Sequence, residues 1–149
     1  MHTNVGLIKK MTKSGLIDSG GGFNPFTSEI VNSFICLGFL KVHIKHLKTV
    51  YGQRIKVFCD QLRMHLPKQA KFKIPKGGYF IWVKLPDNMD TKSLRQEARK
   101  HNVDFHQGSL FSHNKELKNY LRLAFALYDE DVLAEGARRL GKVILENLS

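Results

Sequence analysis

The feature that most constrains the fold is a long helical pattern in the first half of the chain. Apolar residues recur there at steps of three and four, namely Leu40, Ile44, Leu47, Tyr51, Ile55, Phe58 and Leu62. Pro67 follows the pattern, where a helix is expected to stop. We predict one amphipathic helix over residues 28–66, or two helices with a bend near Gly52. Such a length exceeds that of most helices in compact domains, so part of it is expected to lie along a larger body.

Two strand candidates follow the helical pattern. The stretch "KFKIP" precedes "KGGYFIWVKLP", in which Tyr79, Ile81 and Val83 alternate with Phe80 and Trp82. This period of two marks a β-strand. Because both alternating sets are bulky and apolar, we expect the start of this strand to be covered on both faces, with Phe80 and Trp82 in the core.

The remaining elements complete a small mixed fold. Asp90 is placed to cap a helix over "TKSLRQEARKH", "VDFHQGSLF" indicates a short strand with a turn at Gly108, and "NYLRLAFAL" indicates a further strand. A last helix has a predicted buried stripe of Leu133, Ala137, Leu140, Ile144 and Leu148. The predicted class is α+β, with a short, mostly antiparallel sheet covered by helices.

The composition favours a soluble protein without a metal site. The chain has 149 residues and a net charge of +11, which would suit a polyanion. Its basic residues are scattered over several segments, however, so a solvated surface is favoured over nucleic-acid binding. Cys36 and Cys59 lack metal-ligand spacing and indicate buried free thiols of a reducing compartment, and the 7 histidines form no tight cluster. No membrane span or signal peptide is recognised, so we expect a cytoplasmic location, with a mitochondrial one left open.

Arg122 is the most informative single residue. It interrupts the apolar run "NYLRLAFAL", where a guanidinium needs a partner or several hydrogen bonds because removal from water is costly. One interpretation is an internal salt bridge with Asp or Glu. The other is that the partner arrives as a ligand, since the planar fork of donors suits a carboxylate or a phosphate. The run alone favours the salt bridge.

Five motifs together resemble a known family. In order they are "SGGGFNPF", "GFLKVHIKHLKTVYGQR", "IPKGGYFIWVKLP", "VDFHQGSLF" and "NYLRLAFALYDEDVLAEGARRL". They resemble the carboxyl-terminal portion of class I/II, fold type I pyridoxal-phosphate-dependent aminotransferases, and within these the 2-aminoadipate and aromatic aminotransferase group. The resemblance implies an interface loop or linker over residues 1–27, an interdomain helix over 28–66 and a small α+β domain over 67–149.

The resemblance also implies roles for single residues. The arginine of the family's "LRLxF" strand binds the substrate α-carboxylate, and that position here is Arg122. The turn that matches "PKGGYF" lies near the substrate channel, which makes Gly77, Gly78 and Tyr79 candidates for the pocket wall. The loop that matches "SGGGFNP" runs at the dimer interface near the partner's active site, so the candidates for contact there are Gly21, Gly22 and Asn24, with a purely structural turn as the equal alternative.

Several parts of the family's machinery have no match in this sequence. Transamination needs a lysine in covalent linkage to pyridoxal 5'-phosphate, set in a Ser- and Gly-rich motif, and Lys9, Lys10 and Lys13 lack that setting. The carboxylate that pairs with the cofactor's pyridine nitrogen and the aromatic residue stacked on its ring are also absent. We therefore expect no catalytic residue in this chain, no cofactor bound to it alone and no transamination by it alone.

The expected function is that of an aminotransferase segment. It would act on amino-acid and 2-oxo-acid substrates within a complete enzyme, as a homodimer or together with the missing large domain. Two alternatives remain: a non-catalytic carboxylate-binding or regulatory domain that forms mixed dimers, and a basic nucleic-acid-binding domain. The identity of the amino-acid substrate is beyond what this sequence specifies.

Overall fold

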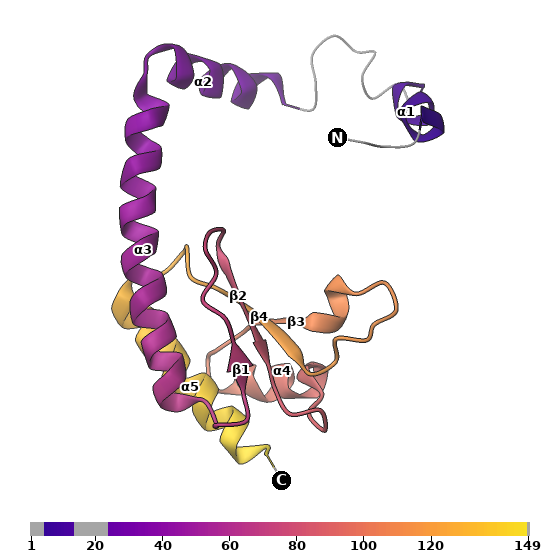
Figure 1. Cartoon of the computed structure of the whole chain (residues 1–149), viewed down its shortest axis with the longest axis vertical. Coiled ribbons are helices and arrows are strands. Elements are labelled where there is room, and N and C mark those ends of the chain that lie inside the picture. The colour runs from indigo at the N-terminus through magenta and orange to yellow at the C-terminus, as the bar shows by residue number, and fades with distance from the viewer. Residues whose placement is uncertain (1–4, 14–23, 149) are drawn as a thin grey trace. The chain divides into compact units, whose positions relative to one another are not determined.

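The computed structural model describes residues 5–13 and 24–148 (Figure 1). The chain divides into two compact units, Met1–His46 and Leu47–Ser149, which are described separately. This boundary falls inside a helix, and the divisions predicted at residues 27/28 and 66/67 stay predictions. The first unit contains α1 (Val5–Thr12), α2 (Pro25–Cys36) and the beginning of α3 (Phe39–His65).

The predicted long helix is two helices, and the predicted position of the bend is wrong. Helix α2 starts at Pro25 because Asn24 caps it, its side chain accepting a hydrogen bond from the backbone N–H of Thr27. It ends before Gly38, whose φ of +76° is the left-handed conformation that favours glycine after a helix. Gly52, the expected bend, lies inside α3.

Helix α2 buries none of its side chains within the described residues, so the predicted burial of Cys36 is wrong, whereas Cys59 of α3 is buried as predicted. Phe26 is 76% exposed, and Ile30 and Ile35 are about half exposed. In the part of the chain that the structure describes, no single helix has the length and hydrophobicity needed to cross a membrane, and α2 and α3 meet those criteria only when taken together as a bent pair.

The second unit is built on an antiparallel sheet, as predicted. Its strands are β1 (Lys71–Phe72), β2 (Phe80–Lys84), β3 (His106–Gln107) and β4 (Tyr120–Ala124). They are ordered β1-β2-β4-β3, with every neighbouring pair antiparallel. Arg122 on β4 pairs with Trp82 on β2 and with His106 on β3, so it occupies the middle of a cross-strand row.

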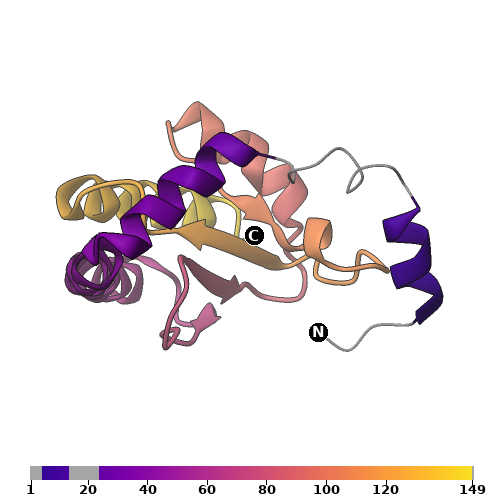
Figure 2. The same cartoon turned by 90° about the horizontal axis from the view of Figure 1, so that it is seen from above.

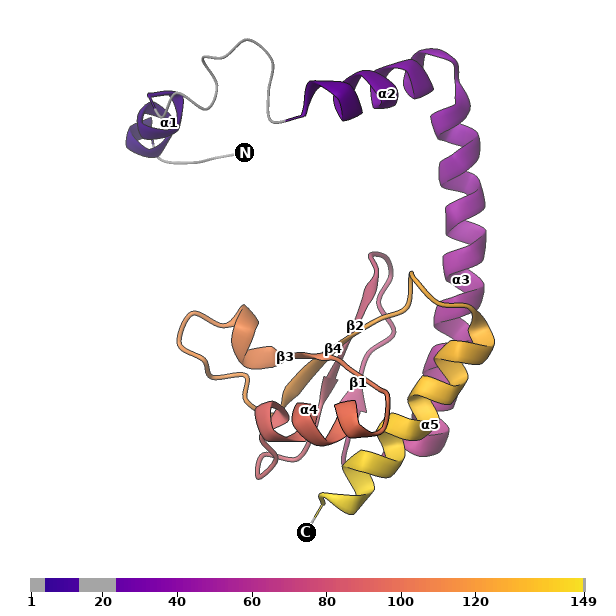
Figure 3. The same cartoon turned by 180° about the vertical axis from the view of Figure 1, so that it is seen from behind.

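Helices cover one face of this sheet. They are α4 (Thr91–Lys100), α5 (Glu130–Glu146) and the part of α3 that belongs to the second unit. Seen from behind, α4 lies in front of the lower part of the sheet, and α5 lies beside the strands, in front of the lower end of α3 (Figure 3). Asp90 caps α4 as predicted, because its side chain accepts a hydrogen bond from the backbone N–H of Lys92 at 2.8 Å. The α+β class is therefore confirmed.

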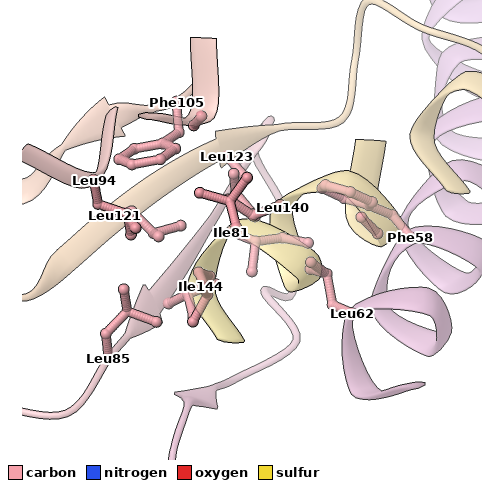
Figure 4. Close-up of a cluster of buried hydrophobic side chains, with 14 of the residues drawn as sticks. Phe58, Leu62, Ile81, Leu85, Leu94, Phe105, Leu121, Leu123, Leu140 and Ile144 are labelled. Carbon is pink, nitrogen blue, oxygen red and sulfur yellow. The ribbon is translucent and has the colours of Figure 1, made fainter. Parts of the chain in front are cut away.

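The core lies between the covered sheet face and these helices (Figure 4). Leu94 and Ala98 of α4 are buried, and so are four residues of the predicted α5 stripe, Leu133, Ala137, Leu140 and Ile144. Leu148 packs against the cluster from its margin. Gly141 brings α5 against the end of α3, since a Cβ at this position would overlap the carbonyl oxygen of His65.

The predicted burial of Phe80 and Trp82 is wrong. Their exposed fractions are 37% and 38%, whereas Ile81 and Val83 on the same strand are fully buried. The reason is that helices cover only one face of the sheet, so alternate residues of β2 point to opposite environments. The uncovered face therefore carries an aromatic surface.

Candidate functional site

The candidate site is the uncovered face of the sheet around Arg122. Alternation along the strands places Phe80 and Trp82 of β2, His106 of β3 and Arg122 of β4 on this face. The short helix η1 (Gly108–Phe111) follows β3 and stands at the sheet margin, as Figures 1 and 2 show. It adds Phe111 to the same surface.

Arg122 is set among aromatic rings rather than carboxylates. Its guanidinium carbon Cζ lies 3.9 Å from the ring centroid of Phe80 and 4.1 Å from that of Phe111. Its Nε is buried and has no hydrogen-bond partner among the described residues. The side chain is half-buried, so the terminal nitrogens Nη1 and Nη2 remain at the surface.

The other arginines of the chain behave differently. Within the described residues each of them forms an ion pair with Asp or Glu, whereas Arg122 has neither an ion pair nor a hydrogen bond through its side chain. The internal salt bridge that the apolar run favoured is therefore not formed by the described part of the chain. The geometry leaves a cationic fork at the surface that could accept a planar anion.

A second set of rings supports the two that contact Arg122. The Phe111 ring meets Trp82 edge-on at 5.4 Å between centroids and His106 at 6.3 Å. The Phe80 ring meets Tyr79 edge-on at 6.4 Å. Edge-to-face pairs at these separations are favourable. The site is thus an aromatic surface in which Phe80 and Phe111 contact the Arg122 guanidinium and further rings pack against these two.

Arg54 fixes the loop that follows the Arg122 strand. From α3 it donates hydrogen bonds to the backbone carbonyl of Ala126 and to Asp129, both at 2.5 Å. Its side chain is largely buried in this position. Asp129 is exposed, so the ion pair itself is a surface pair, whereas the hydrogen bond to the Ala126 carbonyl starts from a guanidinium that is mostly shielded from water. Arg54 therefore ties the end of β4 to α3.

The predicted glycine turn lies beside this surface. Gly77 and Gly78 precede β2, and Gly78 has a φ of +86°, which favours glycine. Tyr79 is 52% exposed and packs edge-on against Tyr51 of α3. Tyr79 therefore links the turn to Phe80 and, through it, to Arg122. The role of these three residues in a substrate pocket stays a prediction.

The candidates of the glycine-rich loop are in the other unit. Asn24 serves as the α2 cap, whereas Gly21 and Gly22 lie outside the described residues. Contact of this loop with a partner subunit stays a prediction.

A separate cavity of about 600 Å³ lies at the start of α5. Its walls include Phe58, Leu123 and Leu140, and its charged lining includes Asp104 and Glu135. Burial acts to raise the pKa of Asp104, but hydrogen bonds from Arg95, Arg99 and the backbone N–H of Phe105 outweigh it and hold that pKa well below its usual range. Hydrogen bonds from Arg138 and Arg139 lower the pKa of Glu135 to about 2. These carboxylates are already paired, and Arg122 does not line this cavity.

Two reactive side chains of this unit, Lys84 and Cys59, do not suit the covalent linkage to the cofactor that the resemblance implies. Covalent linkage to pyridoxal phosphate requires a lysine amine that can lose its proton. Lys84 extends from β2 on the uncovered face, but a hydrogen bond to Asp87 raises its pKa. Burial raises the pKa of the Cys59 thiol, which makes it a poor nucleophile. Nor do the described residues contain a group of His, Cys, Asp and Glu that could hold a metal ion.

Sequence reasoning missed four residues of this site: Phe80, Trp82, His106 and Phe111. The strand register would have found two of them, because the residues opposite Arg122 on neighbouring antiparallel strands must share its face. Phe111 lies outside the strands, so no periodicity identifies its contact with Arg122.

Comparison with curated proteins relates the chain to aminotransferases, although no family model matches it. It is 32% identical over 115 residues to the 2-aminoadipate transaminase of Thermus thermophilus, an alignment that covers 77% of this chain and 29% of that protein. It is 30% identical over 125 residues to aromatic-amino-acid aminotransferase 1 of Thermococcus litoralis, covering 84% of this chain and 30% of the relative. The chain thus spans about three tenths of the length of these relatives.

Solved structures agree with the sequence relatives. The kynurenine aminotransferase of Pyrococcus horikoshii superposes with a TM-score of 0.84 at 32% identity, covering 97% of this chain and 36% of that structure. The α-aminoadipate aminotransferase of Thermus thermophilus also superposes with a TM-score of 0.84, at 27% identity, covering 98% of this chain and 37% of that structure. The fold that the resemblance implied is confirmed.

Proposed function

We propose that this chain, a member of the fold type I pyridoxal-phosphate-dependent aminotransferases, supplies the arginine that binds the α-carboxylate of the amino-acid substrate. One observation carries the proposal. Arg122 is the arginine that has no carboxylate partner among the described residues, and it lies in the centre of the uncovered sheet face. A substrate carboxylate completes its pairing.

The chemistry of this contact is that of a forked donor and a forked acceptor. Two parallel N–H···O bonds between a guanidinium and a carboxylate fix both the position and the orientation of the acid group. The exposed Nη1 and Nη2 atoms of Arg122 are available for such a pair. The neighbouring rings lower the local water content, which strengthens the electrostatic attraction. Arg122 thereby orients the substrate α-carbon with respect to the rest of a complete enzyme.

We further propose that the 149 residues alone do not transaminate. In the family the cofactor carries the amino group between an amino acid and a 2-oxo acid. Lys84, one of the lysines on the uncovered face, is stabilised in its charged form by Asp87 and does not suit the linkage to that cofactor. The role that remains for this chain is to bind and orient the carboxylate.

A fusion protein tests the proposal. The part of the Thermus thermophilus 2-aminoadipate transaminase that this chain does not cover is joined to it, and transamination is measured as kcat/KM. We expect activity from the fusion and none from the chain alone. Arg122→Lys should lower kcat/KM by about 10- to 100-fold, mainly through KM, because lysine cannot form the bidentate pair.

Arg138→Lys is the matched control. Arg138 is exposed and pairs with Glu135 on α5, so its substitution should leave kcat/KM unchanged. Full activity of the Arg122→Lys fusion would contradict the carboxylate role, and transamination by the unfused chain would contradict the proposed inactivity.

Arg122 also supports a second candidate function. A non-catalytic domain that binds carboxylates, or that regulates a full-length homologue through mixed dimers, would use Arg122 in the same way. Exposed apolar residues on α2, such as Phe26 and Ile30, favour an association of this kind. Size measurement of the chain mixed with a full-length relative distinguishes it, because the segment role predicts no mixed dimer.

A further inference from the structure

We infer that Phe80 and Phe111 are positioning residues that hold the Arg122 guanidinium for its carboxylate. This inference rests on the proposed function of Arg122. It adds two residues outside the "LRLxF" motif, Phe80 from β2 and Phe111 from η1, and both rings contact the same guanidinium.

The distances place both rings in direct contact with the charge. Cζ of Arg122 lies over the Phe80 ring at 3.9 Å and over the Phe111 ring at 4.1 Å, well inside the roughly 6 Å limit of a cation–π interaction. The other cation–π contact among the described residues, between Arg63 and Phe72, is 5.8 Å long. Arg122 is therefore held more closely by aromatic rings than any other described arginine.

The rings are not explained by the core. Phe80 is 37% exposed and Phe111 is 43% exposed, and neither belongs to the buried cluster. Their neighbours are the guanidinium and other rings of the same surface, Trp82 and His106 against Phe111 and Tyr79 against Phe80. Burial of apolar area alone would not require two rings at this one charge.

The contact settles which part of the guanidinium can meet a ligand. The rings occupy the space around Cζ, and Nε is buried without a partner, so Nη1 and Nη2 are the nitrogens left at the surface. A guanidinium already held in this orientation loses less rotational freedom when a carboxylate binds. The quadrupoles of the rings also stabilise the cation where water is partly excluded.

The test uses the 149-residue chain with L-leucine as the probe. Binding is measured by calorimetric titration, and the Arg122 side-chain N–H signals are followed by NMR before and during titration. The variants are Phe80→Leu, Phe111→Leu, Phe111→Tyr and Arg122→Lys. Phe26→Leu is the control, because Phe26 is exposed on α2 in the other unit.

We expect Phe80→Leu and Phe111→Leu each to weaken binding of the L-leucine ligand by about three- to tenfold. The introduced side chain keeps the bulk of the phenylalanine but lacks the ring quadrupole. Phe111→Tyr should bind within about twofold of wild type, and Phe26→Leu should be indistinguishable from it. The aromatic rings should displace the chemical shifts of the Arg122 side-chain N–H signals. This displacement should shrink in Phe80→Leu and in Phe111→Leu and persist in Phe111→Tyr. All variants should keep the wild-type unfolding temperature within about 4 °C, because neither ring is in the core.

The outcomes separate this inference from the function on which it rests. If Arg122→Lys abolishes binding while Phe80→Leu and Phe111→Leu bind as wild type does, the carboxylate site stands and the positioning role is overturned. If Arg122→Lys binds leucine unchanged, the proposed function fails. If the wild-type chain does not bind L-leucine at all, the proposed function also fails for this chain. In that case the NMR measurement still tests the positioning role, which is overturned if neither Phe80→Leu nor Phe111→Leu alters the Arg122 signals.

Discussion

The two faces of the small sheet differ in what their side chains do. On the covered face Ile81, Val83, Leu121 and Leu123 are at most 4% exposed and belong to the apolar core. On the opposite face the adjacent residues Phe80 and Trp82 are more than a third exposed and surround a charge. One set of strands therefore provides stability on one side and a binding surface on the other. Substitutions on each face should affect one property with little effect on the other.

The largest expected effect comes from neighbouring residues on β2. Ile81→Ala removes a fully buried side chain and should reduce the free energy of unfolding by about 3 kcal/mol, whereas Phe80→Ala should reduce it by only about 1 kcal/mol. Urea unfolding followed by circular dichroism measures both. Equal losses would show that the uncovered face contributes to the core after all.

The contact between α5 and α3 gives the next largest effect. Gly141→Ala introduces a Cβ that overlaps the carbonyl oxygen of His65, so we expect a loss of about 2 kcal/mol. Gly136→Ala in the same helix is the control, since nothing lies within 4 Å of its added Cβ, and it should stabilise by about 0.5–1 kcal/mol. The same unfolding assay applies. Opposite signs for the two substitutions are the diagnostic result, and a stabilising Gly141→Ala would contradict the close packing.

The ion pairs of Asp104 with Arg95 and Arg99 should make the free energy of unfolding depend on pH in the acidic range. Because the folded-state pKa of Asp104 is lowered, its contribution to stability is present above its unfolded pKa of about 3.9 and is lost as the pH falls below that value. The carboxylate is 44% exposed, so solvent screening reduces the contribution to about 1 kcal/mol. Asp104→Asn should therefore cost about this much at pH 7, and the cost should decline steadily as the pH falls below about 3.9, because the contribution disappears only when the pH passes the lowered folded-state pKa.

Glu116→Gln is the control for this pH dependence. Glu116 is exposed and has no arginine partner among the described residues, so its substitution should leave the stability profile unchanged. A difference between wild type and Asp104→Asn that stays constant from pH 7 to pH 2 would contradict the ion-pair origin of the effect.

The smallest effect on stability is expected at Arg122. Arg122→Leu removes a half-buried charge that has no protein partner, so the free energy of unfolding should change by no more than about 0.5 kcal/mol. A loss of several kcal/mol in the unfolding assay would mean that Arg122 supports the fold and that the two faces do not separate stability from binding.

Much of the fold follows from patterns in the sequence. The period of the strands, the Asp90 cap and the apolar stripe of the last helix all lead to elements that the structure contains. The helix break was missed because Gly52 and Gly38 are equally plausible in sequence, and only Gly38 adopts a positive φ. The burial of Phe80 and Trp82 was misjudged for a different reason. Apolar side chains indicate the core unless they surround a charge, and that arrangement depends on strand pairing between distant segments.

A comparison of two ligands tests most directly whether Arg122 on the uncovered face binds the substrate carboxylate. Calorimetric titration of the chain with L-leucine and with L-leucinamide compares an intact α-carboxylate with a neutral amide of nearly the same shape. We predict that wild type binds leucine at least about tenfold more tightly than leucinamide and that Arg122→Leu removes this preference, because the bidentate charge pair is lost. Equal affinity for the two ligands, or a preference that survives in Arg122→Leu, would contradict the assignment of Arg122 to the substrate carboxylate.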